Sequence, residues 1–371
     1  MPGIGFQDKF KRLKREYLLQ SALNDAGNIV CSLFHEGKLL STQFLPSLDN
    51  LSERDLSETL HEIHRQYLSD FDSLLALVEK TMESEKPELI EKLGKTLYNR
   101  QLYDEGLKLL ENAVERFPDY HGYRDLLGKI YVAQNRIGDA ERELLKAVKL
   151  APGFPDYRNH LGISYLKLNK AVAAVNEFKK ATEINIYYHN AFYNLGLGYI
   201  LNGIVREDYD MARNIAENCR EAFSKATLFN PGYLSPEYHR GQSSLDKGRF
   251  RDAYEDLQKA SRAGEIASFQ SELLEMYLRN VHGTDEMTEE GTNDYIERLN
   301  SIIKTNPGYA DLHNEIGMAY TIMGKLIIDK AIGHFEQALE INPDFERAGK
   351  NLKLSRNDLK GFEVLLGAIL K

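Results

Sequence analysis

A spacing of 34 residues recurs along most of this sequence and limits the folds open to it. Four glycines mark the spacing, and alanines further along each segment follow it. The marks are Gly94, Gly128, Gly162 and Gly196, then Ala113, Ala147 and Ala181. A period of this length indicates one supersecondary unit stacked many times, because a single unit cannot bury its apolar face alone.

The residue types at the repeated positions favour a pair of helices in each unit. Small Gly and Ala let two helices approach closely, Tyr, Phe and Leu fill the seams, and proline ends the second helix. Segment 121–154 shows all of these features. It carries Leu127-Gly128, Tyr131, Ala140, Leu144, Ala147 and Pro152.

This pattern resembles the tetratricopeptide-repeat family over about 260 residues. The resemblance implies a mainly α fold, an α-solenoid of about seven helix-turn-helix units plus capping helices. Units are expected near 87, 121, 155, 189, 234, 268 and 310, within an array spanning 87–345. Residues 346–371 are expected to form the capping helices that close the last unit.

The sequence also departs from the family pattern. It contains no Trp, and Arg124 and Arg158 are among the residues at the position where the family often has one. The unit near 189 is longer by 11 residues, which predicts a longer second helix over 209–229. The unit near 268 is the weakest match, with Glu275 where Gly is expected and an acidic surface loop over 283–291. The last unit gains two residues near Gly324.

Residues 1–86 do not fit the repeat and predict a small α+β head. Residues 6–19 place Phe6, Phe10, Leu13 and Tyr17 at helical spacing, which predicts an amphipathic helix. Segments 28–34 and 38–45 read as two strands joined at Glu36-Gly37. A long helix is expected over about 53–82. The head should therefore be helix, β-hairpin and helix, and its function is not disclosed by the sequence.

Charge, cysteine content and hydropathy limit the cellular locations and the classes of binding partner that we expect. The net charge is -9, which argues against nucleic acid as a partner. No apolar run is long enough to span a bilayer, and the start of the chain lacks the apolar core of a signal peptide. Two cysteines are too few for a disulfide framework, so a cytoplasmic location is expected. The basic residues Lys9, Lys11, Arg12, Lys14 and Arg15 leave two readings of helix 6–19, packing on the head, which we favour, or contact with a membrane surface.

No residue set predicts catalysis, a cofactor or a metal site. His61 and His64 are three residues apart, whereas two zinc ligands on one helix face need a spacing of four. We therefore expect both to be surface histidines. Cys31 and Cys219 read as small packing residues. The acids at 285–290 lack the alternation of a calcium loop. We expect the chain not to be an enzyme.

The family resemblance places the binding surface on the first helix of each unit, which lines the concave face. Those positions form a partly apolar groove flanked by polar groups, and such a patch suits an amphipathic helix or an extended peptide. The candidate partner-binding residues are Lys129, Asn159, Ile163, Leu166, Asn190, Tyr193, Leu197, Ile200, Tyr238 and Gln242.

Three functions follow from these observations. The favoured one is a protein–protein interaction scaffold that binds a peptide or helix in the groove. A self-assembling structural protein and a regulatory subunit with a ligand-sensing head are the alternatives, and homo-oligomers remain open. Members of the family that bind acidic chaperone tails use a clamp of Lys, Asn and Arg. Here Glu91, Lys95, Asp125, Asp156 and His160 are among the residues at those positions, so such tails should not bind.

Overall fold

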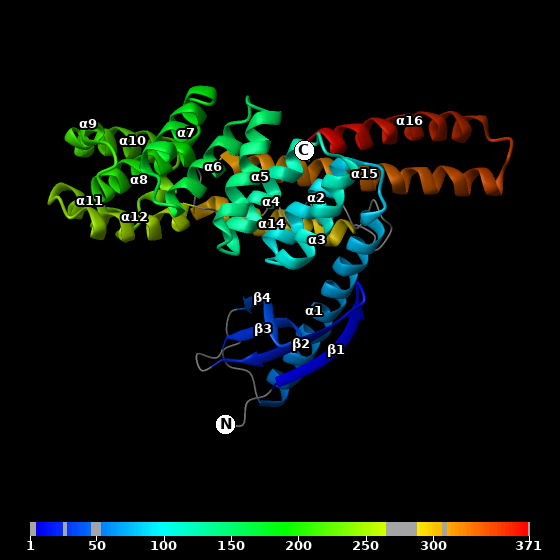
Figure 1. Cartoon of the computed structure of the whole chain (residues 1–371). Helices are drawn as coiled ribbons and strands as arrows, with labels where there is room; N and C mark the ends of the chain where they lie inside the picture. Colours follow the sequence, from blue (N-terminus) through cyan, green and yellow to red (C-terminus); the bar gives the residue numbers. More distant parts are fainter. Residues whose placement is uncertain (1–4, 25–27, 46–52, 265–287, 306–309, 370–371) are drawn as a thin grey trace. The chain divides into compact units, whose positions relative to one another are not determined.

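The computed structural model describes residues 5–24, 28–45, 53–264, 288–305 and 310–369. It divides into two compact units, residues 1–268 and 269–371, and each is described by itself. The first unit holds a small sheet, a long helix and a series of helix pairs, and the second holds three helices (Figure 1). The chain is a mainly helical solenoid with a small α+β head, as expected from the sequence.

The head is a four-stranded antiparallel sheet backed by one helix. Its strands are β1 (Gly5–Arg12), β2 (Arg15–Leu23), β3 (Ile29–His35) and β4 (Lys38–Leu45), in the order β1-β2-β3-β4. Helix α1 (Glu53–Met82) crosses one face of this sheet (Figure 1). The predicted hairpin and long helix are confirmed, and Glu36 and Gly37 form the turn with φ of 50° and 77°.

The helix predicted over residues 6–19 is wrong, because these residues form β1, a tight turn and most of β2. Leu13 and Lys14 make the turn, with φ of 53° and 61°. The apolar residues fit a period of two as well as they fit a helix, and Phe10 lies opposite Tyr17 with ring centroids 5.5 Å apart. Pairing with β3 satisfies the backbone hydrogen-bonding groups of β2, and this pairing favours a sheet over a helix for these residues.

The basic residues of this hairpin form ion pairs within the fold. Lys9 lies 3.0 Å from Glu16, and Arg12 lies 2.6 Å from Asp72 of α1. Arg15 lies 3.3 Å from Glu105, whose side chain is fully buried. Residues 6–19 therefore do not form the amphipathic helix through which membrane contact was considered, and two of their charges pack inward.

The array consists of helices in antiparallel pairs. The first pairs are α2 (Pro87–Asn99) with α3 (Tyr103–Arg116), α4 (His121–Ala133) with α5 (Ile137–Leu150), and α6 (Pro155–Lys167) with α7 (Ala171–Ile184). Helix α8 (His189–Val205) pairs with α10 (Ile215–Phe229), after a short α9 (Tyr209–Arg213). A 3-10 turn η1 (Pro231–Tyr233) leads to the pair α11 (Pro236–Asp246) and α12 (Phe250–Gly264).

The turn between the two helices of a pair has the same backbone conformation in successive units. Gln101, Asn135 and Asn169 have φ of 61°, 60° and 56°, and Gly248 has 67°. Each of these residues lies seven positions after the repeat glycine of its unit. The turn is therefore a fixed feature of the unit, and glycine is the residue that adopts it most easily.

The repeat glycines lie where the two helices of a pair are closest. A Cβ added to Gly128 would lie 2.4 Å from Leu144, and one added to Gly162 would lie 2.4 Å from Phe178. At Gly196 the neighbour is Phe223, at 2.6 Å. The large side chain of the second helix thus occupies the volume that a first-helix side chain would need.

A repeated ion pair takes the place of the missing tryptophan. Arg124 lies 2.7 Å from Glu143, and Arg158 lies 2.9 Å from Glu177 in the next unit. Lys146 and Lys180 approach the same carboxylates at 2.9 Å and 2.6 Å. Burial works against ionisation of Glu143, but hydrogen bonds from Lys146 and Arg124 outweigh it and hold the pKa of this carboxyl below its usual value.

Replacement of Glu143 by Gln should lower the free energy of unfolding by about 1.5–3 kcal/mol, the usual contribution of hydrogen bonds to charged groups. Because the pKa of Glu143 is lowered in the folded chain, its contribution is complete above the pKa of an unfolded glutamate, about 4.3. It is lost as the pH falls through the lowered pKa. Urea unfolding of both proteins from pH 7 to pH 3 measures this, and a difference that is constant with pH would contradict it.

In the lengthened unit near 189, the added residues do not lie where the sequence predicted. The single longer second helix expected over 209–229 is wrong, because α9 and α10 are separated at Asn214. Helix α8 is extended instead, to Val205. Asp208 then begins α9 by accepting a hydrogen bond from the backbone N–H of Met211 at 2.9 Å. Asn202 fixes the connection through two hydrogen bonds to the backbone of Asp208.

The second compact unit contains α14 (Glu289–Thr305), α15 (Ala310–Ile341) and α16 (Glu346–Ile369). The helix-turn-helix predicted near 310 is wrong, because α15 is one continuous helix through Gly324. The capping region is a single helix, α16, which runs back along α15 (Figure 1). Most of the unit predicted near 268, including Glu275 and residues 283–287 of its acidic loop, lies outside the described residues.

Candidate binding surface of the repeat array

The ten residues predicted to bind a partner come from the first helices of four units. Helix α4 supplies one, α6 three, α8 four and α11 two. Helix α4 packs beside α6, and α6 packs beside α8, so these three form a continuous surface. The side chains on it fall into a buried set and a half-buried set.

Six of the ten residues are buried in the folded chain, including nearly all of the apolar ones. They are Asn159, Leu166, Tyr193, Leu197, Ile200 and Tyr238. All but Asn159 belong to one apolar core that also includes residues of α7, α10 and α12. The apolar pattern in the sequence therefore marks packing between units, and these side chains support a binding surface from beneath.

Tyr193 shows how this core is built. Its ring stacks on Tyr233 with centroids 4.2 Å apart and meets the edge of Phe223 at 5.0 Å. Its hydroxyl donates a 2.8 Å hydrogen bond to the backbone carbonyl of Leu257 on α12. Burial is the main reason that the pKa of this phenol is raised.

A ladder of polar contacts links each first helix to the next. His160 lies 2.7 Å from the Asp125 carboxylate, and Asn194 donates to the Asn159 side-chain oxygen at 2.9 Å. At the amino-terminal ends of the helices, the Tyr120 hydroxyl donates to Glu91 at 2.6 Å. These groups already satisfy one another, so they set the spacing of the units.

Four predicted residues stay half-buried and open to contact: Lys129, Ile163, Asn190 and Gln242. The Lys129 ammonium lies 4.4 Å from the centre of the Tyr98 ring. Asn190 accepts a hydrogen bond from the Tyr233 hydroxyl. The Gln242 side-chain nitrogen has no hydrogen-bond partner among the described residues. This nitrogen is itself buried, so a partner does not reach it in the folded chain.

Acidic chaperone tails should bind this surface no better than a scrambled peptide. The positions of the carboxylate clamp hold Glu91 paired with Lys95 at 2.9 Å, and Asp125 paired with His160. These carboxylates repel a terminal carboxylate and occupy the nearest cations. Isothermal titration calorimetry with such a peptide should show no binding at 100 micromolar, and a low-micromolar dissociation constant would contradict this.

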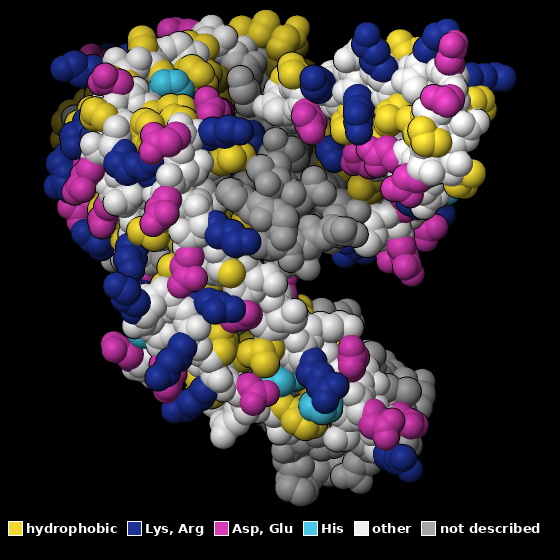
Figure 2. Space-filling view, turned by 90° about the vertical axis from the view of Figure 1, so that its right-hand side faces the viewer, with side chains coloured by type: hydrophobic (Ala, Val, Ile, Leu, Met, Phe, Trp, Pro, Cys, Tyr) yellow, Lys and Arg dark blue, Asp and Glu magenta, His cyan; other side chains and the backbone are white. Residues whose placement is uncertain are grey.

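The charged side chains on the face seen in Figure 2 are mixed in sign. Lys and Arg alternate with Asp and Glu, and neither kind gathers into a single field over the described residues of that face. Many are paired locally, such as Lys170 with Glu141 at 2.9 Å. This distribution favours recognition by individual side chains over long-range attraction.

The surface role predicted for His64 is wrong, because this residue is buried between α1 and the sheet. One ring nitrogen lies 2.9 Å from the Ser21 hydroxyl and the other 3.1 Å from Asp8. Ser21 in turn lies 3.2 Å from the Cys31 sulfur. The prediction failed because only the register of β2 on β3 brings Ser21 and Cys31 beneath the helix.

This Asp8–His64–Ser21–Cys31 chain is a structural link. Ser21 and Cys31 are buried, so no substrate reaches the hydroxyl or the sulfur. Burial raises the pKa of the Cys31 thiol, which keeps it in the unreactive protonated form. Cys219 is likewise buried with a raised pKa, and both cysteines occupy packing positions as expected. Among the described residues, no cluster of three metal-ligating side chains occurs.

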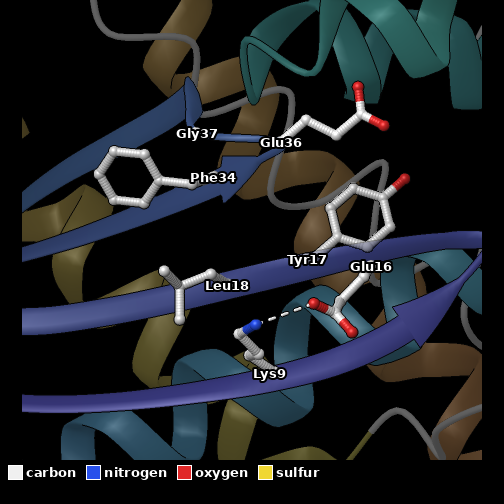
Figure 3. A pocket seen from close by; sticks show the side chains of 7 residues that line it. All are labelled: Lys9, Glu16, Tyr17, Leu18, Phe34, Glu36 and Gly37. Carbon is white, nitrogen blue, oxygen red and sulfur yellow. Dashed lines mark hydrogen bonds and ion pairs between the residues drawn. The ribbon is translucent and has the colours of Figure 1, made fainter.

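A shallow pocket lies on the side of the sheet near the β3–β4 turn (Figure 3). Leu18 and Phe34 form its apolar wall, and the Lys9–Glu16 ion pair lies at one side. The lining also includes Tyr17, Glu36 and Gly37.

Comparison with known proteins identifies the repeat. A family model described as tetratricopeptide repeat matches residues 126–189. Solved structures with similar folds include MamA, with 22% identity over 46% of this chain and 94% of that one, at a TM-score of 0.35. YrrB, described as a TPR protein with an unusual peptide-binding site, is 20% identical over 50% and 91%, with a TM-score of 0.36. PilF of Pseudomonas aeruginosa is 16% identical over 62% and 97%, with a TM-score of 0.38. No curated protein sequence matches.

Proposed function

Given that this chain is a tetratricopeptide-repeat protein, we propose that it is a scaffold that binds a peptide or helical segment of a partner protein. The segment lies across the first helices of the central units, over α4, α6 and α8. The single observation that carries this proposal is the continuous surface of these helices, whose spacing is fixed by paired polar groups.

The half-buried residues of that surface supply the proposed contacts. Ile163 offers an apolar anchor, and Lys129 offers a cation held near an aromatic ring. An apolar anchor flanked by polar groups that pair with a peptide backbone is a common arrangement for segment recognition. The buried apolar residues beneath hold these groups in place.

A double substitution of two half-buried positions tests the proposal. Lys129→Glu with Ile163→Glu reverses one charge and places another where the apolar anchor was, at the edge of the core against which Ile163 packs. We expect proteins that the wild-type chain captures specifically and stoichiometrically to lose at least tenfold in affinity, measured with each purified partner by biolayer interferometry.

The matched control makes the same changes on a second helix. Leu145 and Lys149 are exposed on α5, so Leu145→Glu with Lys149→Glu should leave affinity unchanged. Both proteins should keep the wild-type circular dichroism spectrum. Equal binding by the wild type and both variants would show that the partner uses another surface.

We place the protein in the cytoplasm and assign it no catalytic role. The support is that both cysteines are unpaired and buried, which suits a reducing compartment. None of the described helices is long and apolar enough to cross a membrane.

A further inference from the structure

Most of the exposed large apolar residues described in the first compact unit lie at one edge of the array. At this edge the second helices α5, α7 and α10 end, and the chain connects each of them to the next first helix. All of the residues concerned lie within 53–264, which the structure describes without a gap. Six of them, which we call the apolar row, are each 41–73% exposed: Leu150, Phe154, Ile184, Ile186, Tyr187 and Leu228.

Contacts between successive connections make the apolar row continuous. Tyr188, in the middle connection, hydrogen-bonds to Asp156, which lies two residues after Phe154 at the start of α6. Tyr187 meets the edge of the Phe229 ring at the end of α10, with ring centroids 5.4 Å apart. The three connections therefore lie side by side, and the apolar row forms one patch.

The sequence of the apolar row contains no charge. Segments 150–154, 184–188 and 228–234 lack Lys, Arg, Asp and Glu, whereas the connection before them contains Arg116 and Asp119. Nucleic acids and anionic membranes attract basic surfaces, so neither is matched by this patch. Its chemistry instead suits a second uncharged, apolar surface.

The most exposed part of the middle connection departs from the repeat. Ile186 and Tyr187 stand where the neighbouring connections have Pro-Gly, at 152–153 and 231–232. The Asn185 side chain accepts a 3.0 Å hydrogen bond from the Tyr187 backbone N–H and so fixes the turn without a proline. The turn does not depend on the two apolar side chains, which are 60% and 67% exposed.

The size of the patch is close to what one partner buries in a stable protein pair. Side chains of this size and exposure leave roughly 700 Å² of apolar surface open to solvent along the row. The largest apolar patch on a typical monomer is about 300–600 Å². A stable interface buries about 800 Å² on each partner.

We propose that the apolar row is the interface of a homodimer, in which two copies of the chain bury their rows against each other. A twofold axis through the middle connection sets the two rows antiparallel. Leu150 and Phe154 of one copy then lie over Leu228 of the other, and the two Tyr187 rings meet beside the axis. Both ends of the row are apolar, so none of its residues is left facing solvent. The pairing is symmetric and closes as a dimer.

This dimer leaves the first-helix surface open to a partner. The apolar row lies at the amino-terminal ends of the first helices, whereas Lys129 and Ile163 lie in the second halves of α4 and α6. Each dimer carries two such surfaces, which raises the apparent affinity for a partner with two matching segments. The dimer itself requires no partner, so its test is independent of the proposed function.

A double substitution that gives the middle connection the residues of its neighbours should abolish the dimer. Ile186→Pro with Tyr187→Gly removes the centre of the apolar row. The backbone before it is suited to proline, because Asn185 has φ of -128° and ψ of 102°. Asn230, which precedes Pro231, has φ of -139° and ψ of 95°. The variant should therefore keep the wild-type circular dichroism spectrum.

The matched control is Tyr209→Gly, which removes a tyrosine that is 73% exposed at the opposite edge of the array. In light scattering at 50 micromolar, the wild type and this control should have about twice the mass of one chain, and the double variant the mass of one. A monomeric wild type, or equal masses for all three proteins, would overturn the proposal. A monomeric wild type that co-sediments with phosphatidylcholine vesicles would assign the row to a lipid surface instead.

Crosslinking locates the interface even if the double variant does not fold. Tyr187→Cys places one thiol of each copy beside the proposed axis, and a short bismaleimide should then join two chains. Tyr209→Cys, treated in the same way, should stay a single chain. The native cysteines are buried and should react slowly. Equal crosslinking of the two variants, or none with Tyr187→Cys, would contradict a twofold interface at the apolar row.

Discussion

Substitution of Tyr193 by Glu is expected to unfold much of the array, with a loss of more than about 4 kcal/mol in the free energy of unfolding. Loss of a large buried aromatic side chain costs about 3–5 kcal/mol. The carboxyl group introduced here adds to this, because it would lie between the rings of Tyr233 and Phe223. Buried carboxyl groups favour their neutral form, so the defect should grow as the pH rises from 5 to 8.

Tyr193→Phe separates packing from hydrogen bonding at the same position. It keeps the ring and removes only the hydroxyl that donates to Leu257, so a loss of about 1–3 kcal/mol is expected from the carbonyl left without this donor. Thermal unfolding followed by circular dichroism at 222 nm measures both variants. If Tyr193→Glu were as stable as the wild type, the residue would belong to an open groove after all.

The sequence predicted the repeat array well because its signals are local and recur. Gly128 and Gly162 mark the closest approach of the two helices in their units. Each further unit with the same mark strengthens the assignment of the units before it to the repeat. The same period also extends to charged residues. Arg124 and Arg158, and Glu143 and Glu177, are each 34 residues apart, which would have predicted the repeated ion pair.

The binding surface was harder to predict because burial depends on neighbours that are distant in sequence. The family positions correctly gave residues on the first helices, but they could not show that α12 covers Tyr193. Exposure separates Ile163, which is half-buried, from Ile200, which is fully buried, although both are apolar and occupy predicted contact positions. The pattern of apolar residues alone does not distinguish a groove from a core.

The helix predicted over residues 6–19 of the head was wrong because the apolar residues of this segment fit both the period of a helix and the period of a strand. Phe6, Phe10 and Tyr17 fit a helix by spacing, whereas in the strands Phe6 and Phe10 are half-buried among exposed residues of β1, and β2 alternates between buried and half-buried residues. The choice depended on pairing with β3, which lies beyond the window of a local pattern. Short apolar runs are ambiguous for this reason.

Gly162→Ala should lower the free energy of unfolding by about 1–3 kcal/mol, the usual cost of overfilling a packed core. Alanine favours a helix over glycine by about 0.5–1 kcal/mol, so intrinsic propensity predicts the opposite sign. Geometry decides the outcome here, because the added Cβ would lie 2.4 Å from the ring of Phe178. The ring is fully buried in a packed core, so its neighbours would have to move to make room.

Gly138→Ala supplies the matched control, since it makes the same chemical change where no clash exists. Gly138 lies in the first turn of α5, and a Cβ there meets no described atom within 4 Å. This variant should be as stable as the wild type or more stable, by up to about 1 kcal/mol. Urea unfolding of the two variants should therefore shift in opposite directions. If Gly162→Ala also gained stability, the pairing of repeat glycine with Phe178 would not limit the approach of the two helices. The repeat would then tolerate alanine at this position.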